Sequence, residues 1–125
     1  MIEVGEYVRI DSDFRLIALG IGEVTKINQD TIYVKMNLDL PISLKTENIT
    51  KHSKNIIDLI EENDIVEYRI NSLSEFKVGR VKKYKGARSY KQYLGVEGYD
   101  ITKIYIETIL TKEQYNANRY TVERK

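Results

Sequence analysis

The chain contains one phrase twice, and this repetition limits the folds open to it. Residues 2–10 read IEVGEYVRI, and residues 60–70 read IEENDIVEYRI. A second pair follows in the same order, GEVTKI at residues 22–27 and GRVKKY at residues 79–84, 57 positions later. Order and spacing that persist in this way indicate an internal repeat. Two copies with this period predict two small units side by side and not a solenoid.

The two predicted units cover residues 1–53 and 54–125 of the 125-residue chain. Their last segments also match, ISLKTENITK in the first unit and IYIETILTK in the second. Units of this size bury too little of their surface to be more than marginally stable alone. We therefore expect the two units to pack against each other.

Each unit is predicted to consist of short strands. The segments EYVRI and TIYVKM are rich in the β-branched and aromatic residues that favour strands. The sequence NQD between Ile27 and Thr31 is typical of a tight turn, so residues 22–36 are expected to form a hairpin. Its inward-facing residues are expected to be Val24, Ile27, Ile32 and Val34.

This order of strands resembles that of the small SH3-like barrels of KOW and Tudor modules. The predicted fold class is mainly β, with two tandem SH3-like barrel units packed together and one or two short helical turns. Residues 53–63 fit either a helix or an extended linker, and the alignment of the repeats favours a short turn. Thr111 and Gln114 have the spacing of a capping box, which predicts a short helix before a last strand at residues 120–124.

The composition excludes several classes of function. The chain has no cysteine, which excludes disulfide scaffolds, thiolate metal sites and cysteine nucleophiles. The single histidine, His52, has no partner in the sequence pattern for acid–base or metal chemistry, and we interpret it as a linker residue. Phosphate-binding glycine loops and nucleophile motifs are also absent from the sequence. We therefore expect no catalytic residue, metal ion, cofactor or enzymatic activity.

A cytoplasmic location is expected from the same sequence. The first residues, MIEVGEYV, have no basic region followed by a long apolar run, so no signal peptide is predicted. No apolar stretch approaches the roughly 18 residues that a membrane span requires. Hydrophobic residues make up 42% of the chain, which is enough for a packed core.

The strongest candidate for a binding surface lies in the second unit, where residues 77–93 read KVGRVKKYKGARSYKQY. This segment contributes +7 to a chain whose net charge is +1, so the remainder carries −6. Its cations can neutralise phosphates, and its tyrosines can stack on bases. It would also suit an acidic protein surface, while the plain structural interpretation is a strand edge guarded by lysines. The candidate binding residues are Lys77, Arg80, Lys82, Lys83, Tyr84, Lys85, Arg88, Tyr90, Lys91 and Tyr93.

The first unit has only the short NQD turn where the second has this basic segment. Loops on a rigid scaffold commonly vary when they carry function. We therefore predict that the second unit bears an extended basic hairpin loop, at about residues 77–98, and that this loop makes the functional contacts.

Two other segments, residues 49–70 (ITKHSKNIIDLIEENDIVEYRI) and residues 106–123 (IETILTKEQYNANRYTVE), resemble small phage- and prophage-encoded proteins of clostridia and related Firmicutes. Those proteins carry an HSxNIIDLIExGDxV segment, in which Asn63 of this chain stands where glycine is usual, and an ILTKEQY segment. The resemblance implies a phage accessory protein that acts in the host cytoplasm. By analogy, it implies a non-enzymatic inhibitor of a host defence or nucleic-acid-handling complex, similar to anti-CRISPR proteins.

Two hypotheses about the partner remain open. In the first, the basic loop contacts a host protein or nucleoprotein complex, such as a CRISPR effector. In the second, the chain binds nucleic acid directly and without sequence preference, as KOW-like modules do, so that binding weakens as salt is added. An exposed barrel edge leaves both a monomer and a homodimer open.

Overall fold

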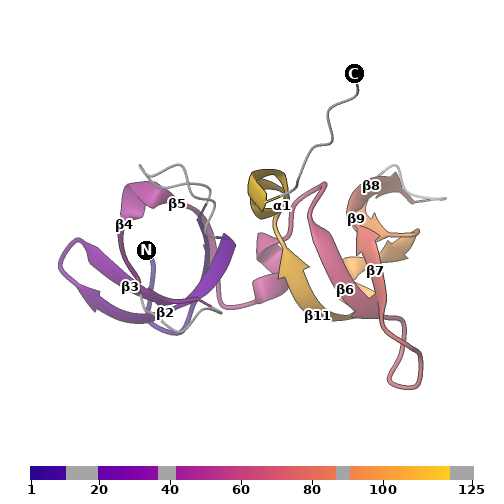
Figure 1. The fold of residues 1–125 in the computed structure, drawn as a ribbon, viewed down its shortest axis with the longest axis horizontal. Helices are drawn as coiled ribbons and strands as arrows, with labels where there is room; N and C mark the ends of the chain where they lie inside the picture. Colours follow the sequence, from indigo (N-terminus) through magenta and orange to yellow (C-terminus); the bar gives the residue numbers. More distant parts are fainter. Residues whose placement is uncertain (11–19, 37–41, 87–90, 119–125) are drawn as a thin grey trace.

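The computed structural model describes residues 1–10, 20–36, 42–86 and 91–118 (Figure 1). The chain is mainly β and forms several small antiparallel sheets. Residues 1–53, the first half, and residues 54–125, the second half, lie side by side along the long axis of the molecule (Figure 1). None of the helices in the described ranges combines the length and the apolar character needed to cross a membrane.

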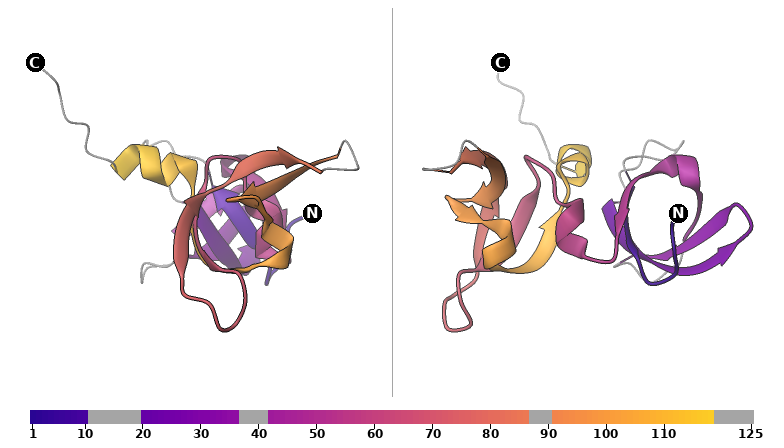
Figure 2. Two further views of the ribbon diagram at one scale, coloured as in Figure 1. Left: turned by 90° about the vertical axis from the view of Figure 1, so that its right-hand side faces the viewer. Right: turned by 180° about the vertical axis from the view of Figure 1, so that it is seen from behind.

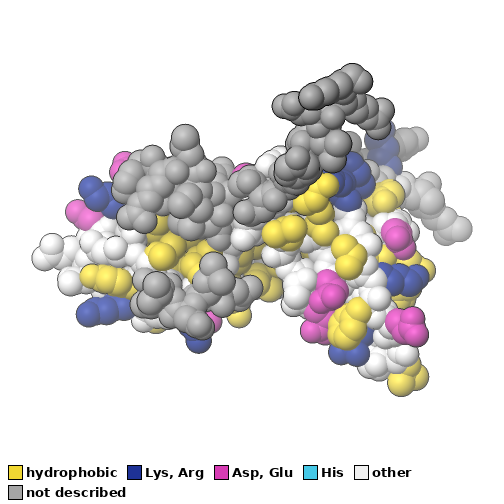
Figure 3. All heavy atoms as spheres, in the orientation of Figure 1, with side chains coloured by type: hydrophobic (Ala, Val, Ile, Leu, Met, Phe, Trp, Pro, Cys, Tyr) yellow, Lys and Arg dark blue, Asp and Glu magenta, His cyan; other side chains and the backbone are white. Residues whose placement is uncertain are grey.

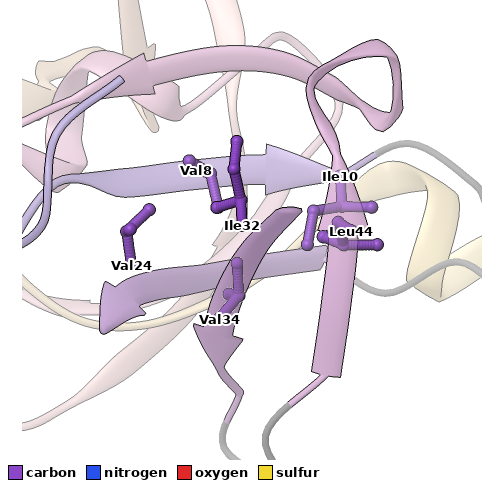
Figure 4. Packing of buried hydrophobic residues seen from close by; sticks show 6 residues of the cluster. All are labelled: Val8, Ile10, Val24, Ile32, Val34 and Leu44. Carbon is purple, nitrogen blue, oxygen red and sulfur yellow. The ribbon is translucent and has the colours of Figure 1, made fainter. Parts of the chain in front are cut away.

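The first half contains one five-stranded antiparallel sheet, with the strand order β4-β3-β2-β1-β5. Its elements are β1 (Tyr7–Ile10), β2 (Gly20–Asn28), β3 (Thr31–Lys35), β4 (Ile42–Lys45), the 3-10 helix η1 (Thr46–Asn48) and β5 (Ile49–Ser53). Apolar residues alternate along these strands, so one face of the sheet collects them. Figure 4 shows the resulting core of Val8, Ile10, Val24, Ile32, Val34 and Leu44, all of them buried.

The predicted hairpin of the first half is confirmed, with β2 and β3 paired across a turn at Gln29 and Asp30. The prediction that Ile27 faces the core is wrong, because Ile27 is 37% exposed. A β-bulge between Val24 and Lys26 keeps Ile27 opposite Ile32, but Ile27 lies near the tip of the hairpin, where it is not covered by the core.

The second half begins with the 3-10 helix η2 (Ile56–Leu59) and then forms two three-stranded sheets, ordered β11-β6-β7 and β10-β9-β8. Its elements are β6 (Ile65–Arg69), β7 (Lys77–Arg80), β8 (Lys82–Lys85), β9 (Gln92–Val96), β10 (Tyr99–Asp100), the 3-10 helix η3 (Ile101–Lys103), β11 (Tyr105–Leu110) and the α-helix α1 (Lys112–Asn118). A separate core contains Ile60, Val66, Tyr68, Val81, Val96 and Ile101.

The two halves share an equivalent pair of backbone hydrogen bonds at the repeated sequence positions. In the first half, Gly5 N–H donates to the Val24 carbonyl at 2.9 Å, and Val24 N–H donates to the Glu6 carbonyl at 2.8 Å. In the second half, the equivalent pair of bonds joins Val81 to Asn63 and to Asp64, both at 2.8 Å. Both turns need a left-handed residue, with φ of 91° at Gly5 and 77° at Asn63. Asparagine tolerates this conformation better than most residues, which explains why it can replace glycine here.

The predicted closure of each unit into a barrel is not found, since no sheet formed by the described strands closes on itself. In the first half, β4 and β5 lie at opposite edges of the sheet, separated along the chain by η1. In the second half, the segment equivalent to β2 is interrupted at Val81. On either side of Val81, β7 pairs with β6 and β8 pairs with β9.

A glycine at the same position of each repeat allows the strands to approach closely. A Cβ atom at Gly22 would overlap the side chain of Val34, and one at Gly79 would overlap that of Val96. Val34 and Val96 are both fully buried in the two cores. The glycine before the shared valine of the repeat is therefore required by packing and not by backbone conformation.

Replacing Gly79 with alanine is expected to lower the free energy of unfolding by about 1–3 kcal/mol, because the added methyl overpacks the core against Val96. Chemical denaturation followed by circular dichroism would measure the change. Val78→Ala on the same strand is the matched control, since Val78 is 65% exposed and its loss should cost no more than about 0.5 kcal/mol. Equal stability of Gly79→Ala and the parent chain would contradict this packing assignment.

Arg9 on β1 connects the two halves. Its guanidinium is fully buried and donates through Nη1 to the Leu59 carbonyl at 2.9 Å and to Asp64 Oδ2 at 2.6 Å. Nη2 donates to Asp64 Oδ1 and to Glu113 Oε2, both at 2.8 Å. A bidentate pair of this kind fixes both distance and orientation. The contact therefore sets the position of β1 relative to η2, β6 and α1.

We call this contact between the two halves the junction. Asp64 is the buried partner of Arg9 in the junction, and its carboxylate oxygens accept further hydrogen bonds. Besides Arg9, its carboxylate accepts from the backbone N–H of Glu61 at 2.8 Å and from that of Lys112 at 2.9 Å. The second bond holds the first residue of α1. Buried charges are tolerated when paired and fully hydrogen-bonded in this way.

Glu61 extends the junction toward the solvent. Its carboxylate contacts Lys112 Nζ at 3.0 Å, Lys51 Nζ at 3.4 Å and Arg9 Nε at 3.4 Å. The charges of the junction therefore balance, with three carboxylates (Glu61, Asp64 and Glu113) and three cations (Arg9, Lys51 and Lys112). Burial alone would raise the pKa of Glu61, but the hydrogen bond from Lys112 and the charges of Arg9 and Lys51 lower it below its usual value. Glu61 accordingly stays ionised beside the Arg9 cation.

Candidate functional site

The predicted basic segment forms a hairpin that extends from the second half. Strands β8 and β9 pair in the register Lys82–Gly95, Lys83–Leu94, Tyr84–Tyr93 and Lys85–Gln92. Figure 2 shows this hairpin reaching out from the body of the second half. The connection runs from residue 86 to residue 91, whereas the equivalent turn of the first half has two residues.

The hairpin brings together six of the ten predicted binding residues, Lys82, Lys83, Tyr84, Lys85, Lys91 and Tyr93. Two others, Lys77 and Arg80, lie on β7 in the neighbouring sheet. The remaining two, Arg88 and Tyr90, lie outside the described residues. Within the range predicted for the extended basic hairpin loop, about residues 77–98, β8 and β9 form the hairpin, whereas residues 77–80 form β7 of the neighbouring sheet.

The six hairpin residues are divided between two faces. Side chains alternate along a strand, so Lys82 and Tyr84 share one face while Lys83 and Lys85 share the other. Cross-strand pairing places Tyr93 beside Tyr84. Lys91 joins the same face by alternation with Tyr93, and its carbonyl accepts from Gly86 N–H at 3.2 Å. We call Lys82, Tyr84, Lys91 and Tyr93 the tyrosine face.

Tyr84 and Tyr93 form a stacked pair at the centre of the tyrosine face. Their ring centroids are 5.6 Å apart, and the ring planes meet at 24°. Gly95 lies beneath them, since a Cβ there would come within 3.1 Å of Tyr93 and within 3.0 Å of Tyr84. The Tyr93 hydroxyl donates to the Gly98 carbonyl at 3.0 Å. Both rings are therefore held in place before any ligand arrives.

The lysines of the hairpin are exposed, and none of them forms an ion pair with a described carboxylate. Lys82 Nζ donates to the neutral Asn63 side chain at 3.0 Å. Elsewhere on the second half acidic and basic side chains are mixed, as Figure 3 shows for one face of the molecule. Charges that carry no local partner remain available to an anionic ligand.

Arg80 has a different environment from the hairpin lysines. Its guanidinium lies over the ring of Tyr115 on α1, 5.2 Å from the ring centroid, and Nη1 donates to the Asn63 carbonyl at 3.5 Å. These contacts direct Arg80 toward α1. Lys77 pairs with Tyr68 of β6, so β7 belongs to a different sheet from the hairpin. Arg80 and Lys82 of the tyrosine face nevertheless both bond to Asn63.

A pocket of about 420 Å³ opens beside the tyrosine face. Tyr93 forms part of its lining, together with Tyr99, Ile70, Ile104, Asp100 and Lys103. Gly98 contributes to the lining through a two-residue turn, in which Glu97 and Gly98 both have positive φ. The sequence analysis did not identify Tyr99 or Lys103 as site residues. The Glu-Gly pair before Tyr99 was an available signal, because it predicts a tight hairpin turn next to Tyr93.

A second pocket, of about 430 Å³, lies between the two halves and is lined by residues of β1, β2, β3 and β11. Its charged lining consists of Glu23, Glu107 and Lys35. Two carboxylates and one cation make this pocket a poor match for phosphate, in contrast to the hairpin.

His52 lies in β5 and not in a linker, which corrects the interpretation from the sequence. Its Nδ1 is 2.6 Å from Glu6 Oε2, and Glu6 precedes β1 at the position equivalent to Asp64. The pairing of β1 with β5 brings the two side chains together. Within the described ranges, no cluster of three or more histidine or carboxylate residues is suited to hold a metal ion.

The junction is built largely from residues 49–70 and 106–123. Leu59, Glu61 and Asp64 come from residues 49–70, and Lys112 and Glu113 come from residues 106–123. The predicted capping box is confirmed, with Thr111 N–H donating to Gln114 Oε1 at 3.0 Å and Gln114 N–H donating to Thr111 Oγ1 at 3.2 Å. These motif residues therefore have an architectural role, and the basic hairpin lies outside them.

Comparisons with protein-family models, with curated proteins and with solved structures found no match to this chain.

Proposed function

We propose that the protein is a non-enzymatic nucleic-acid-binding protein that engages the phosphate backbone through the β8–β9 hairpin. The observation that carries this proposal is the set of four exposed lysines on the hairpin, Lys82, Lys83, Lys85 and Lys91, without a carboxylate partner among the described residues. Such cations bind a polyanion by releasing its condensed counterions.

The tyrosine face favours nucleic acid over an acidic protein surface as the ligand. A nucleic acid presents both phosphates for the lysines and aromatic bases that can stack on the tyrosine rings. Tyr84 and Tyr93 lie among the lysines and are held by their mutual stacking and by Gly98. The combination of a basic strand pair with ordered rings is typical of binding without sequence preference.

The repeated order of elements supports a related proposal about the fold, that each half is an open SH3-like unit of the KOW or Tudor type. In both halves a strand follows a left-handed turn, two further strands form a hairpin, and a 3-10 helix precedes the last strand. The β2 equivalent of the second half is divided at Val81, which frees β8 and β9 to extend as a binding hairpin.

A wider biological role is also proposed, namely that the chain is a phage accessory protein that inhibits a host defence or nucleic-acid-handling complex. The resemblance of residues 49–70 and 106–123 supports the phage context. A basic hairpin would act there by binding the nucleic acid of the complex, as in a CRISPR effector. Capture of host nucleoprotein by the parent chain, and not by a chain lacking the hairpin lysines, would support this role.

Titration of a labelled oligonucleotide at several salt concentrations tests the central proposal. If the four hairpin lysines contact four phosphates, the logarithm of the binding constant should fall with the logarithm of salt concentration with a slope of about −3 on a single strand. Fluorescence anisotropy would measure the affinities. Failure to bind any oligonucleotide at low salt would overturn the proposed function.

A further inference from the structure

The pocket beside Tyr93 points to a more specific ligand than a phosphate backbone. We infer that this pocket receives one unpaired base, so that the ligand is single-stranded nucleic acid in which a base leaves the stack. The inference rests on the proposed function, because the hairpin lysines must first hold the strand. It assigns a base-binding role to Tyr99 and a phosphate-binding role to Lys103, both of which lie outside the basic segment.

The size and the walls of the pocket fit a nucleobase. Its volume of about 420 Å³ lies within the range for small-ligand sites and is large enough to admit a single base. Tyr93 and Tyr99 supply aromatic surface, and Ile70 and Ile104 supply apolar surface. Tyr99 is 42% exposed, so its ring remains available to a ligand. Aromatic stacking of this kind accepts any base, because every base has a π face.

The charged groups of the pocket are Asp100 and Lys103. Asp100 Oδ1 is already occupied, since it accepts from Thr102 N–H at 2.9 Å and from Thr102 Oγ1 at 2.7 Å. Asp100 therefore serves to begin η3. Lys103 is exposed at the same pocket and forms no ion pair with a described carboxylate. It is the residue placed to contact the phosphate beside the bound base.

The path from the hairpin to the pocket is continuous. Tyr93 belongs both to the tyrosine face and to the pocket lining. Its hydroxyl bonds to Gly98, directly before Tyr99. A strand that follows Lys91 and Tyr93 along the hairpin therefore arrives at the pocket, with Lys103 beyond it. A duplex keeps its bases paired and stacked, so it can contact the lysines without placing a base against Tyr99.

The test compares three ligands, a single strand, an abasic strand and a duplex. Each strand has the same length and the same backbone charge. The parent chain should bind the single strand at least tenfold more tightly than the abasic strand. Tyr99→Thr, which keeps a strand-forming residue, should reduce single-strand affinity about tenfold and leave the salt slope and duplex affinity unchanged. Tyr105→Thr on β11 is the matched control, since Tyr105 is also exposed, at 54%, and lies outside the pocket.

A spectroscopic readout separates a base-binding role from a structural one. A single strand containing 2-aminopurine should show quenched fluorescence on binding the parent chain, and Tyr99→Thr should remove most of the quenching. Equal affinity for the abasic and single strands, or quenching unchanged by Tyr99→Thr, would overturn the inference while the lysine-dependent binding of the proposed function still held. Absence of binding to all three ligands would overturn the proposed function itself, and the inference with it.

Discussion

Replacing Arg9 with methionine is expected to lower the free energy of unfolding by about 3–5 kcal/mol. The substitution removes the bidentate partner of Asp64, whose side chain is fully buried, and leaves its charge without a counterion in the interior. It also frees the Leu59 carbonyl and Glu113, which Arg9 ties to β1. Chemical denaturation followed by circular dichroism would measure the change.

Two further variants define the origin of this effect. Arg9→Lys keeps the charge but cannot make the forked contacts to Asp64, so it should recover only part of the lost stability. Lys51→Met removes a 44% exposed cation that contacts only Glu61 in the junction, at 3.4 Å, and should cost less than about 1 kcal/mol. A loss below 1 kcal/mol for Arg9→Met would show that the junction does not depend on the Arg9–Asp64 pair.

Reversing the charge of Lys82, Lys83, Lys85 and Lys91 to glutamate is expected to weaken nucleic-acid binding by roughly a thousandfold at low salt. Each reversal replaces an attraction to phosphate by a repulsion, and one such pair of charges is worth about 1 kcal/mol at contact in water. The lost attraction alone totals about 4 kcal/mol over the four positions, which is close to three orders of magnitude. Anisotropy titration of a single-stranded oligonucleotide would measure the loss.

The matched control reverses four exposed lysines outside the hairpin, Lys26, Lys35 and Lys45 in the first half and Lys54 directly after it. It changes the net charge of the chain by the same amount but leaves the hairpin intact. If binding depended only on net charge, both variants would lose equal affinity, and the assignment of the hairpin as the interface would be wrong. Thermal unfolding of both variants checks that the two halves remain folded, and exposed lysines on these strands should contribute little to stability.

Local sequence patterns predicted those parts of the structure that depend on neighbouring residues. The NQD turn and the capping box of Thr111 and Gln114 are both short-range signals, and the structure confirms each one. The repeat predicted equivalent positions in the two halves, and the backbone bonds of Val24 and Val81 confirm that equivalence.

Apart from the exposure of Ile27, the errors concern contacts between residues far apart in the chain. Whether β4 meets β5, and whether β7 continues into β8 within one sheet, depends on long-range hydrogen bonds that no local pattern encodes. His52 was misplaced for the same reason, since its position is decided by the pairing of β5 with β1. Strand β5 reads ITKHS and lacks a clear alternation of apolar and polar residues, which is the pattern by which a strand is recognised in a sequence.

The sequence by itself determined that this protein has two related β-rich halves and that a basic, tyrosine-bearing segment belongs to the second half alone. Repetition and composition suffice for these conclusions, because they are properties of the chain before it folds. Only the tertiary structure decided that Arg9 is buried against Asp64, 55 residues away, and that Tyr93 shares a pocket with Tyr99. The cost of burying a charge and the packing of a pocket depend on the folded surroundings of each side chain, which the order of residues does not state.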